Sequence, residues 1–330
     1  MAFVSPDRIE GIAKVMSPFI RKTPLQAGTG PYQNLLFKRE DLQITNSFTV
    51  RAAFGILMGL SKRQLERGIV LTTPGNLGWG LAYALNRLKL PTKLHIVIPE
   101  DAVGAKRDGL LSLASDQIQI TQKGNSELER YEVVREIAKS QGFQELELHN
   151  RQDEVAAKGS IAVEIHEDLS HLEHGGQLGN GGSHFEFYCP IGSGALAAGC
   201  AIWLKARLGS RVRIIGAEPA NANDFSRLFY QNEKSSNLAP STIADSLRSP
   251  QVRTEYQDSL LELVDEVIEV DENEILEEMK SLYETSQIVG EPSSVITLRA
   301  AKQAKPSNTT TRICLLTAAN VDRSAYEFWG

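Results

Sequence analysis

The amino-acid sequence predicts an α/β protein built around mostly parallel sheets. Short apolar runs alternate with helical segments along most of the chain, and turn residues separate them. The chain has 330 residues, of which 42% are hydrophobic, which is enough for one large core or two smaller ones. We therefore expect two domains.

The expected elements follow from apolar periodicity and from capping residues. A first amphipathic helix begins after the Ser5-Pro6 turn. The expected strands are 35–40, 69–73, 93–98, 117–121, 185–191, 213–218, 263–270 and 313–317. The expected helices are 51–62 (capped by Asn46-Ser47), 78–89, 106–114, 126–141, 159–169, 196–208 and 272–286 (opened near Asp271). The glycine-rich segment 174–182 is expected to be a solvated surface loop, with a functional lid as the alternative.

Charge and composition exclude several classes of protein. The formal charge is -6, from 35 basic and 41 acidic residues, and there is no basic block of the kind that binds nucleic acid. No stretch approaches the roughly 20 apolar residues of a membrane span, and the N-terminus lacks the apolar region of a signal peptide. The three cysteines have no metal-like spacing and suit a reducing interior. We expect a cytoplasmic protein without nucleic-acid or membrane partners.

A glycine-containing turn is the sharpest local signal in the chain. It joins the expected strand 185–191 to the helix that follows, and it consists of Gly192, Ser193, Gly194, Ala195 and Leu196. Backbone N–H groups can converge there on an anion at the positive end of the helix dipole, so a phosphate is one interpretation. A tight turn without a ligand is the other. A dinucleotide site is a further alternative, because Glu218 has suitable spacing, although Ala197 stands where that motif needs glycine.

Several separated segments, in the right order, together resemble one family. They are 37–43 with 47–53 (FKREDLQ and SFTVRAA), 74–80 (PGNLGWG), the turn at Gly192, 242–245 (TIAD), Glu291-Pro292, and 316–320 (LTAAN). This pattern is similar to the fold-type II pyridoxal-phosphate enzymes, and within them to threonine/serine dehydratases and serine racemases. The resemblance implies a tryptophan-synthase-beta-like, two-domain, three-layer sandwich. It also implies pyridoxal phosphate as cofactor, a small amino acid or a derived ligand, and a homodimer.

The resemblance also implies domain limits and site residues. A small domain of residues 67–148 would interrupt a large domain of residues 1–66 and 149–330. The turn from Gly192 to Leu196 would hold the cofactor phosphate. Phe48 would pack on the pyridine ring, Asn76 would bond the ring hydroxyl, and Thr317 would bond the pyridine nitrogen; for Phe48 a plain core role is equally compatible.

The decisive departure from the family pattern is Thr49. The family has lysine at this position, which forms the Schiff base with the cofactor and later moves the substrate proton. A threonine hydroxyl forms no imine and is a poor base at neutral pH. Pro74 stands where racemases of the family have a proton-handling serine, and Ala52, Ala318 and Ala319 add methyl groups where the family has glycine. We therefore expect Thr49 and Pro74 to be inactive.

Two other lysines could in principle substitute for the missing amine. Lys38 is expected to have a structural or solvated role. Lys158 lies in a stretch where the family has glutamine, and to replace the lost amine it would need to reach the cofactor with near-attack geometry.

A possible cation site follows the strand 213–218. Glu218, the carbonyl of Ala222 and Asp224 resemble the segment with which serine racemases bind a divalent cation, and they offer oxygen ligands to Mg²⁺ or Ca²⁺. The alternative is a strand end and a turn, with Asp224 as a helix N-cap.

Three functions are compatible with these residues. The first is a pseudoenzyme, or a protein that binds pyridoxal phosphate or a related ligand noncovalently. The second is an active lyase with altered chemistry. The third is a regulatory partner of an active paralogue.

Overall fold

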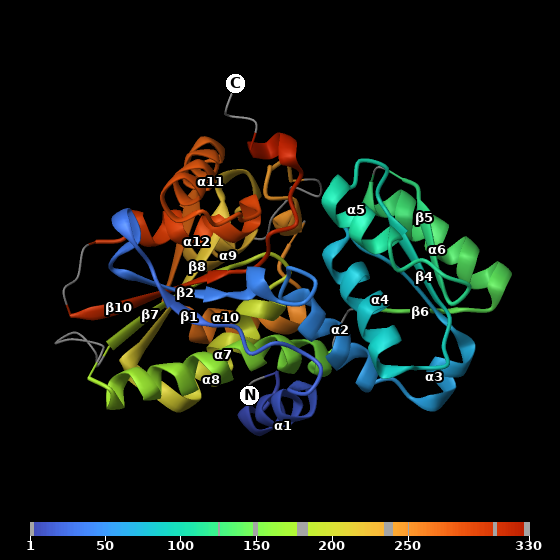
Figure 1. The fold of residues 1–330 in the computed structure, drawn as a ribbon, viewed down its shortest axis with the longest axis horizontal. Coiled ribbons are helices and arrows are strands. Elements are labelled where there is room, and N and C mark those ends of the chain that lie inside the picture. The colour runs from blue at the N-terminus through green and yellow to red at the C-terminus, as the bar shows by residue number, and fades with distance from the viewer. Residues whose placement is uncertain are drawn as a thin grey trace.

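The computed structural model describes residues 3–124, 126–147, 151–176, 184–233, 240–249, 251–305 and 309–326. Within these ranges the chain forms two lobes, each built around one sheet (Figure 1). We call the lobe around the six-stranded sheet the large domain and the lobe around the four-stranded sheet the small domain. Most of the predicted glycine-rich loop, at 177–182, lies outside the described residues.

The sheet of the large domain has the order β1-β2-β10-β7-β8-β9. All its neighbouring strands are parallel except the pair β1 and β2. Its strands are β1 Leu25–Ala27, β2 Leu35–Arg39, β7 His184–Pro190, β8 Val212–Pro219, β9 Glu266–Val270 and β10 Thr310–Leu316.

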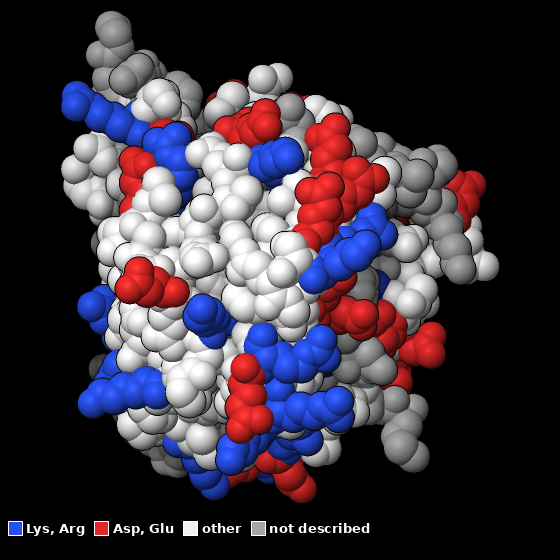
Figure 2. All heavy atoms as spheres, turned by 90° about the vertical axis from the view of Figure 1, so that its right-hand side faces the viewer, with Lys and Arg blue, Asp and Glu red and all other residues white. Residues whose placement is uncertain are grey.

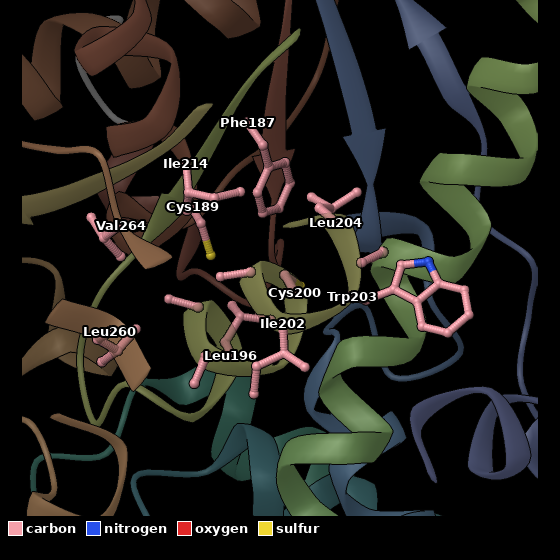
Figure 3. Packing of buried hydrophobic residues seen from close by; sticks show 14 of the residues in the cluster. Phe187, Cys189, Leu196, Cys200, Ile202, Trp203, Leu204, Ile214, Leu260 and Val264 are labelled. Atoms are coloured by element: carbon pink, nitrogen blue, oxygen red, sulfur yellow. The ribbon is translucent and has the colours of Figure 1, made fainter. Parts of the chain in front are cut away.

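Helices cover both faces of this sheet and give the large domain three layers. One core joins β7 and β8 to α1 Pro6–Met16, α7 Gln152–His174, α8 Ala195–Leu208 and α10 Thr254–Leu263. Figure 3 shows side chains of this core, among them Leu196 and Cys200 of α8 and Phe187 and Cys189 of β7. A second core, on the other face, joins the sheet to α11 Glu272–Ser286 and α12 Pro292–Gln303. The short helix α9 Asp224–Gln231 follows β8.

The small domain has the strand order β5-β4-β3-β6, with every neighbouring pair parallel. Its strands are β3 Ile69–Thr72, β4 Leu94–Ile98, β5 Ile118–Gln122 and β6 Gln144–Glu145. Its helices are α3 Lys62–Arg67, α4 Asn76–Leu88, α5 Gly104–Leu111 and α6 Glu127–Gln141. The outer face of this domain has basic and acidic side chains interspersed around an uncharged area (Figure 2).

The helix α2 Thr49–Met58 lies where the two lobes meet (Figure 1). It packs against α4 of the small domain and α7 of the large domain. A Cβ added at Gly80 of α4 would lie 3.0 Å from Cα of Val50, so glycine permits this close approach of α4 to the start of α2.

The predicted α/β class with mostly parallel sheets is confirmed. Two predicted elements need correction, and some elements were missed. The predicted helix 51–62 is two helices, because Ser61 begins a new one: its hydroxyl accepts from the N–H of Gln64, whose side chain accepts from the N–H of Ser61. The predicted strand 263–270 begins only at Glu266, because residues 254–263 form α10. The helix α12 was not predicted.

No helix in the described ranges has both the length and the apolar character needed to cross a membrane.

Candidate cofactor site

Two predicted site segments follow neighbouring strands of the large sheet. The turn that begins at Gly192 comes directly after β7, and Thr317 is the residue after β10. Because β7 and β10 are parallel neighbours, both segments leave the sheet at the same edge. In Figure 1, β10 runs toward the small domain, so this edge faces the junction of the two domains.

The turn from Gly192 to Leu196 has the geometry of an anion-binding helix start. Gly194 is the N-cap of α8, and its φ of +91° lies in the region that favours glycine. A Cβ at Gly194 would lie 2.8 Å from Cδ1 of Leu260. Within the described ranges no side chain caps α8, so the N–H groups of its first turn have no side-chain acceptor there. The backbone conformation of this turn and the dipole of α8 are therefore both suited to binding a phosphate group.

The segment 242–247 lies directly against this turn. A Cβ at Gly192 would be 3.3 Å from Cδ2 of Leu247 and 3.5 Å from the carbonyl oxygen of Ser246. The neighbouring Asp245 extends across the domain junction and accepts hydrogen bonds from Nζ of Lys106 at 2.7 and 2.9 Å. The small domain thus contacts the turn at Gly192 through Lys106 and the segment 242–247.

A buried hydrogen-bonded network surrounds Asn76, the first residue of α4. Its Nδ2 donates to Oε1 of Glu291 at 2.9 Å, and its Oδ1 accepts from Nδ2 of Asn320 at 2.9 Å. Nζ of Lys106 lies 3.1 Å from Oε2 of Glu291. An amide nitrogen donates two hydrogen bonds, so one N–H of Asn76 is available for a ligand.

The charges of this network depend on each other. Burial raises the pKa of Glu291 above its ordinary value, although Lys106 opposes the rise. Burial acts to lower the pKa of Lys106, but Glu291 and Asp245 outweigh it and raise that pKa. Lys106 therefore stays an ammonium ion, held between two carboxyl groups at the domain junction.

Phe48 and Thr49 are placed by an isolated contact with the end of β10. The N–H of Phe48 donates to the carbonyl oxygen of Thr317 at 3.0 Å, and Ser47 forms a bridge with Ala318. Thr49 is half-buried and opens α2, and its hydroxyl lies 3.0 Å from the hydroxyl of Ser47. Among the described residues, the Thr317 hydroxyl has no hydrogen-bond partner.

These contacts bring most of the predicted site residues to one place. The backbone of Phe48 is hydrogen-bonded to that of Thr317, and Thr49 follows Phe48 at the start of α2. Asn76 and the Gly192 turn are linked to each other through Lys106, Glu291 and the segment 242–247. Pro74 is exposed and precedes the start of α4, while Ala52 and Ala318 are buried.

The predicted cation ligands are bonded to backbone amides. Glu218 accepts from the N–H groups of Phe225 and Ser226 at 3.1 and 2.7 Å, and Asp224 accepts from the N–H of Val252. Asp224 is the first residue of α9 and not its N-cap, which is Asn223. Across the described ranges, no group of three His, Cys, Asp or Glu residues has the arrangement of a metal site. The cation site formed with Ala222 stays a prediction.

Lys38 has a structural role, as expected from the sequence. Its side chain is fully buried, and Nζ lies 2.6 Å from Oε2 of Glu164. Glu164 also binds Arg51, which in turn binds Glu40 at 2.7 and 2.8 Å. Burial acts to raise the pKa of Glu164, but Arg51 and Lys38 outweigh it and lower that pKa.

Sequence reasoning missed Lys106 as a site residue. The sequence places it near the start of a predicted helix, where nothing distinguishes it from a solvated lysine. Only the folded structure reveals the ion pairs of Lys106, because its partners Asp245 and Glu291 lie far away in the chain.

Two surface hollows lie outside the candidate site. One, of about 1100 Å³, is lined by residues that include Arg67, Arg135 and Arg151. The other, of about 580 Å³, is lined by residues that include Lys14, Trp203 and Arg207. Neither is lined by the turn from Gly192 to Leu196 or by Asn76 and its hydrogen-bond partners.

Known proteins resemble this chain along almost its whole length. It is 28% identical to the catabolic L-threonine dehydratase TdcB of Staphylococcus aureus (strain USA300), over 97% of this chain and 90% of that protein. Maize serine racemase has a similar structure, with a TM-score of 0.83, 26% identity, and coverage of 98% of this chain and 96% of that one. The serine racemase from Dictyostelium discoideum has a TM-score of 0.81, 26% identity, and coverage of 97% of this chain and 100% of that one.

The family profile described as pyridoxal-phosphate dependent enzyme matches residues 16–317. This range includes Thr49, Asn76, the Gly192 turn and Thr317, the residues that the contacts above bring together. The chain therefore belongs to the pyridoxal-phosphate-dependent enzyme family.

Proposed function

We propose that this protein binds pyridoxal phosphate, or a pyridoxal-phosphate amino-acid adduct, noncovalently and does not catalyse the dehydratase or racemase reactions of its relatives. The observation that supports this proposal most is the combination of an anion-binding turn at Gly194 with a threonine at position 49. The turn retains the means of holding a phosphate, while Thr49 lacks the amine of the family lysine.

The side chain of Thr49 has little capacity for proton transfer. It is half-buried, and its hydroxyl lies 3.0 Å from that of Ser47. Neither hydroxyl is a useful base near neutral pH, and neither forms a stable covalent link to an aldehyde. Pro74 also has no group that moves a proton. Neither Thr49 nor Pro74 would therefore transfer a proton or bond covalently to the cofactor.

Other residues retain groups that suit the cofactor. The turn from Gly192 to Leu196 would hold the phosphate by backbone N–H groups. Asn76 would donate its remaining N–H to the ring hydroxyl, and the Thr317 hydroxyl would pair with the ring nitrogen. Phe48 would contact the ring. When bound, the cofactor supplies an aldehyde and a ring that accepts electron density.

Binding and turnover can be measured separately. We expect pyridoxal phosphate to quench the intrinsic fluorescence of the protein saturably, and dialysis to remove the ligand fully. We expect no release of ammonia from L-serine or L-threonine above the rate of free pyridoxal phosphate. Pyridoxal without phosphate is the matched control, and it should bind much more weakly.

Two outcomes would contradict the proposal. If the protein bound pyridoxal phosphate no better than pyridoxal, the phosphate turn would have no binding role. If it released ammonia at rates typical of dehydratases, the interpretation of Thr49 would be wrong.

A further inference from the structure

The first turn of α5 depends on the large domain for its capping. Val103, the residue before this helix, has no side-chain group that accepts a hydrogen bond, and no acidic residue lies in the first turn. Instead, the carboxylate of Asp322 accepts from the N–H of Gly104 at 2.9 Å and from the N–H of Ala105 at 2.7 Å. Asp322 follows β10 of the large domain, so it caps a helix of the small domain across the domain junction.

The first residue of α5 leaves room for this carboxylate. A Cβ added at Gly104 would lie only 2.8 Å from Oδ1 of Asp322. Two residues further along α5, Lys106 binds Asp245 and Glu291 of the large domain. The first three residues of α5 are thus all bonded to the large domain, two through their N–H groups and the third through its ammonium group.

The segment that carries Asp322 is itself held on both sides. Before it, the N–H of Asn320 donates at 3.1 Å to Oε1 of Glu291, an oxygen atom of the buried network in the candidate site. After it, the Tyr326 hydroxyl donates to the carbonyl oxygen of Gly290 at 2.8 Å. Figure 1 shows this C-terminal segment, in red, and α5 at the same end of the molecule. Asp322 is therefore positioned by residues that belong to this network or adjoin it.

The chain crosses between the two domains at segments other than α5. It passes from the large domain to the small domain between β2 and β3, and it returns between β6 and β7. At α5 the domains are therefore joined by side-chain contacts, which can break while each domain stays folded. Two domains connected in this way can open and close around the residues that lie between them.

We infer that Asp322 is a positioning residue that holds the small domain closed over the candidate site and thereby slows the release of a bound ligand. The effect on release rests on the proposed function, whereas the contact between the domains does not. A ligand without a covalent anchor leaves when the domains open, so its dissociation rate follows the fraction of open protein. The hydrogen bonds to the Asp322 carboxylate lower that fraction, because they are made only in the closed form.

Removal of the Asp322 carboxylate tests its effect on ligand release. Asp322→Ala should release pyridoxal phosphate about 10-fold faster than the wild type, since hydrogen bonds to a charged group have effects of this size. Asp322→Asn keeps one acceptor oxygen and should have an intermediate rate. Asp108→Ala removes the same kind of side chain from α5 at a position that is 66% exposed, and this control should release the ligand as the wild type does. Stopped-flow dilution of the complex, followed by intrinsic fluorescence, measures these rates.

The distance between two spin labels tests the contact between the domains without any ligand. The three native cysteines are buried, so labels can be attached to cysteines introduced by Leu128→Cys in α6 and Lys280→Cys in α11. Leu128 is 67% exposed, and the side chain of Lys280 is 47% exposed. With Asp322 present, the labelled protein should give one narrow distance distribution. Asp322→Ala should add longer distances, and Asp108→Ala should not.

The two measurements separate a closing contact from an ordinary helix cap. A purely structural cap lowers the thermal stability of Asp322→Ala without faster release, so a dissociation rate equal to that of the wild type would overturn the inference. An unchanged distance distribution would overturn it as well. If Asp322→Ala does not fold, Asp322→Asn decides both measurements. Wild-type protein that binds no pyridoxal phosphate would overturn the proposed function and the effect on release, and the distance distributions then decide whether Asp322 holds the domains together.

Discussion

The backbone N–H of Phe48 donates to the carbonyl oxygen of Thr317 at 3.0 Å. This bond joins the start of α2 to the end of β10, and it is reinforced by the bond from the N–H of Ala319 to the carbonyl oxygen of Asn46 at 2.9 Å. Because backbone atoms make both bonds, they depend little on which side chains occupy these positions. The position of Thr49 is thus fixed by the main chain, so a side chain introduced there should point to the same place.

Thr49→Lys should therefore gain covalent capture of the cofactor. A lysine at the start of α2 brings an amine next to Phe48 and can react with the bound aldehyde. After borohydride reduction, intact-mass measurement should show one added pyridoxyl phosphate group, mapped to position 49. Thr49→Ala, which adds no amine, is the control and should remain unmodified. An unmodified Thr49→Lys protein would show that position 49 does not face the cofactor.

Gly194→Ala should destabilise the fold and weaken phosphate binding. Its φ of +91° is unfavourable for alanine, and the new Cβ would lie 2.8 Å from Leu260 and 3.0 Å from Val252. We expect a loss of about 1–3 kcal/mol in the free energy of unfolding, measured by urea denaturation. Gly11→Ala, within α1 and with no heavy atom within 4 Å of its added Cβ, should instead stabilise the protein by about 0.5–1 kcal/mol. Equal effects of the two substitutions would contradict the conformation of the turn.

Arg51→Met should be among the most destabilising single substitutions away from the phosphate turn. Arg51 is fully buried between Glu40 and Glu164. Its removal takes away the cation that binds the buried Glu40, while Glu164 keeps Lys38. Breaking such a buried pair costs about 3–5 kcal/mol in the free energy of unfolding. Lys62→Met removes one member of an exposed pair with Glu66 and should change that free energy by less than about 0.5 kcal/mol. Comparable urea midpoints for the two variants would rule out the buried network.

The stability of the protein should depend on pH through Asp224. Burial raises the pKa of Asp224 to about 6 from an ordinary value of 3.8, although the N–H of Val252 opposes the rise. Between these values the folded protein holds a proton that the unfolded chain has lost. The contribution of Asp224 to stability is therefore lost as the pH rises from about 4 to about 6.

Asp224→Asn isolates this contribution, because it keeps an acceptor for the Val252 N–H but does not titrate. The difference in free energy of unfolding between the wild type and this variant should change across the same pH range, to the disadvantage of the wild type at the higher pH. A difference that stays constant from about pH 4 to about pH 6 would show that burial does not shift the pKa of this carboxyl group.

The sequence was sufficient for the elements that have strong local signals. The helix 272–286 was predicted with its limits, because Asp271 and Glu274 form a capping box. The glycines around Ser193 marked the turn before α8, since Gly194 needs a positive φ. The parallel sheets followed from the alternation of apolar strands and helices.

Elements without such signals were missed or misplaced. The helix α12 is buried over most of its length and has no amphipathic pattern, so only Pro292 at its first turn indicated a start. The helix α10 was not predicted, and its last residue, Leu263, was assigned to the strand that follows. The contacts of Lys106 could not be predicted, because they depend on two carboxyl groups that only the folded chain brings near.

The central claim is that this protein holds pyridoxal phosphate without a covalent bond. The most direct measurement is borohydride reduction of the wild-type protein saturated with one equivalent of pyridoxal phosphate, followed by intact-mass analysis and peptide mapping. We predict that the protein keeps its unmodified mass although fluorescence shows that the ligand was bound before reduction. A stoichiometric pyridoxyl phosphate adduct on any single lysine of the wild-type chain would contradict the claim.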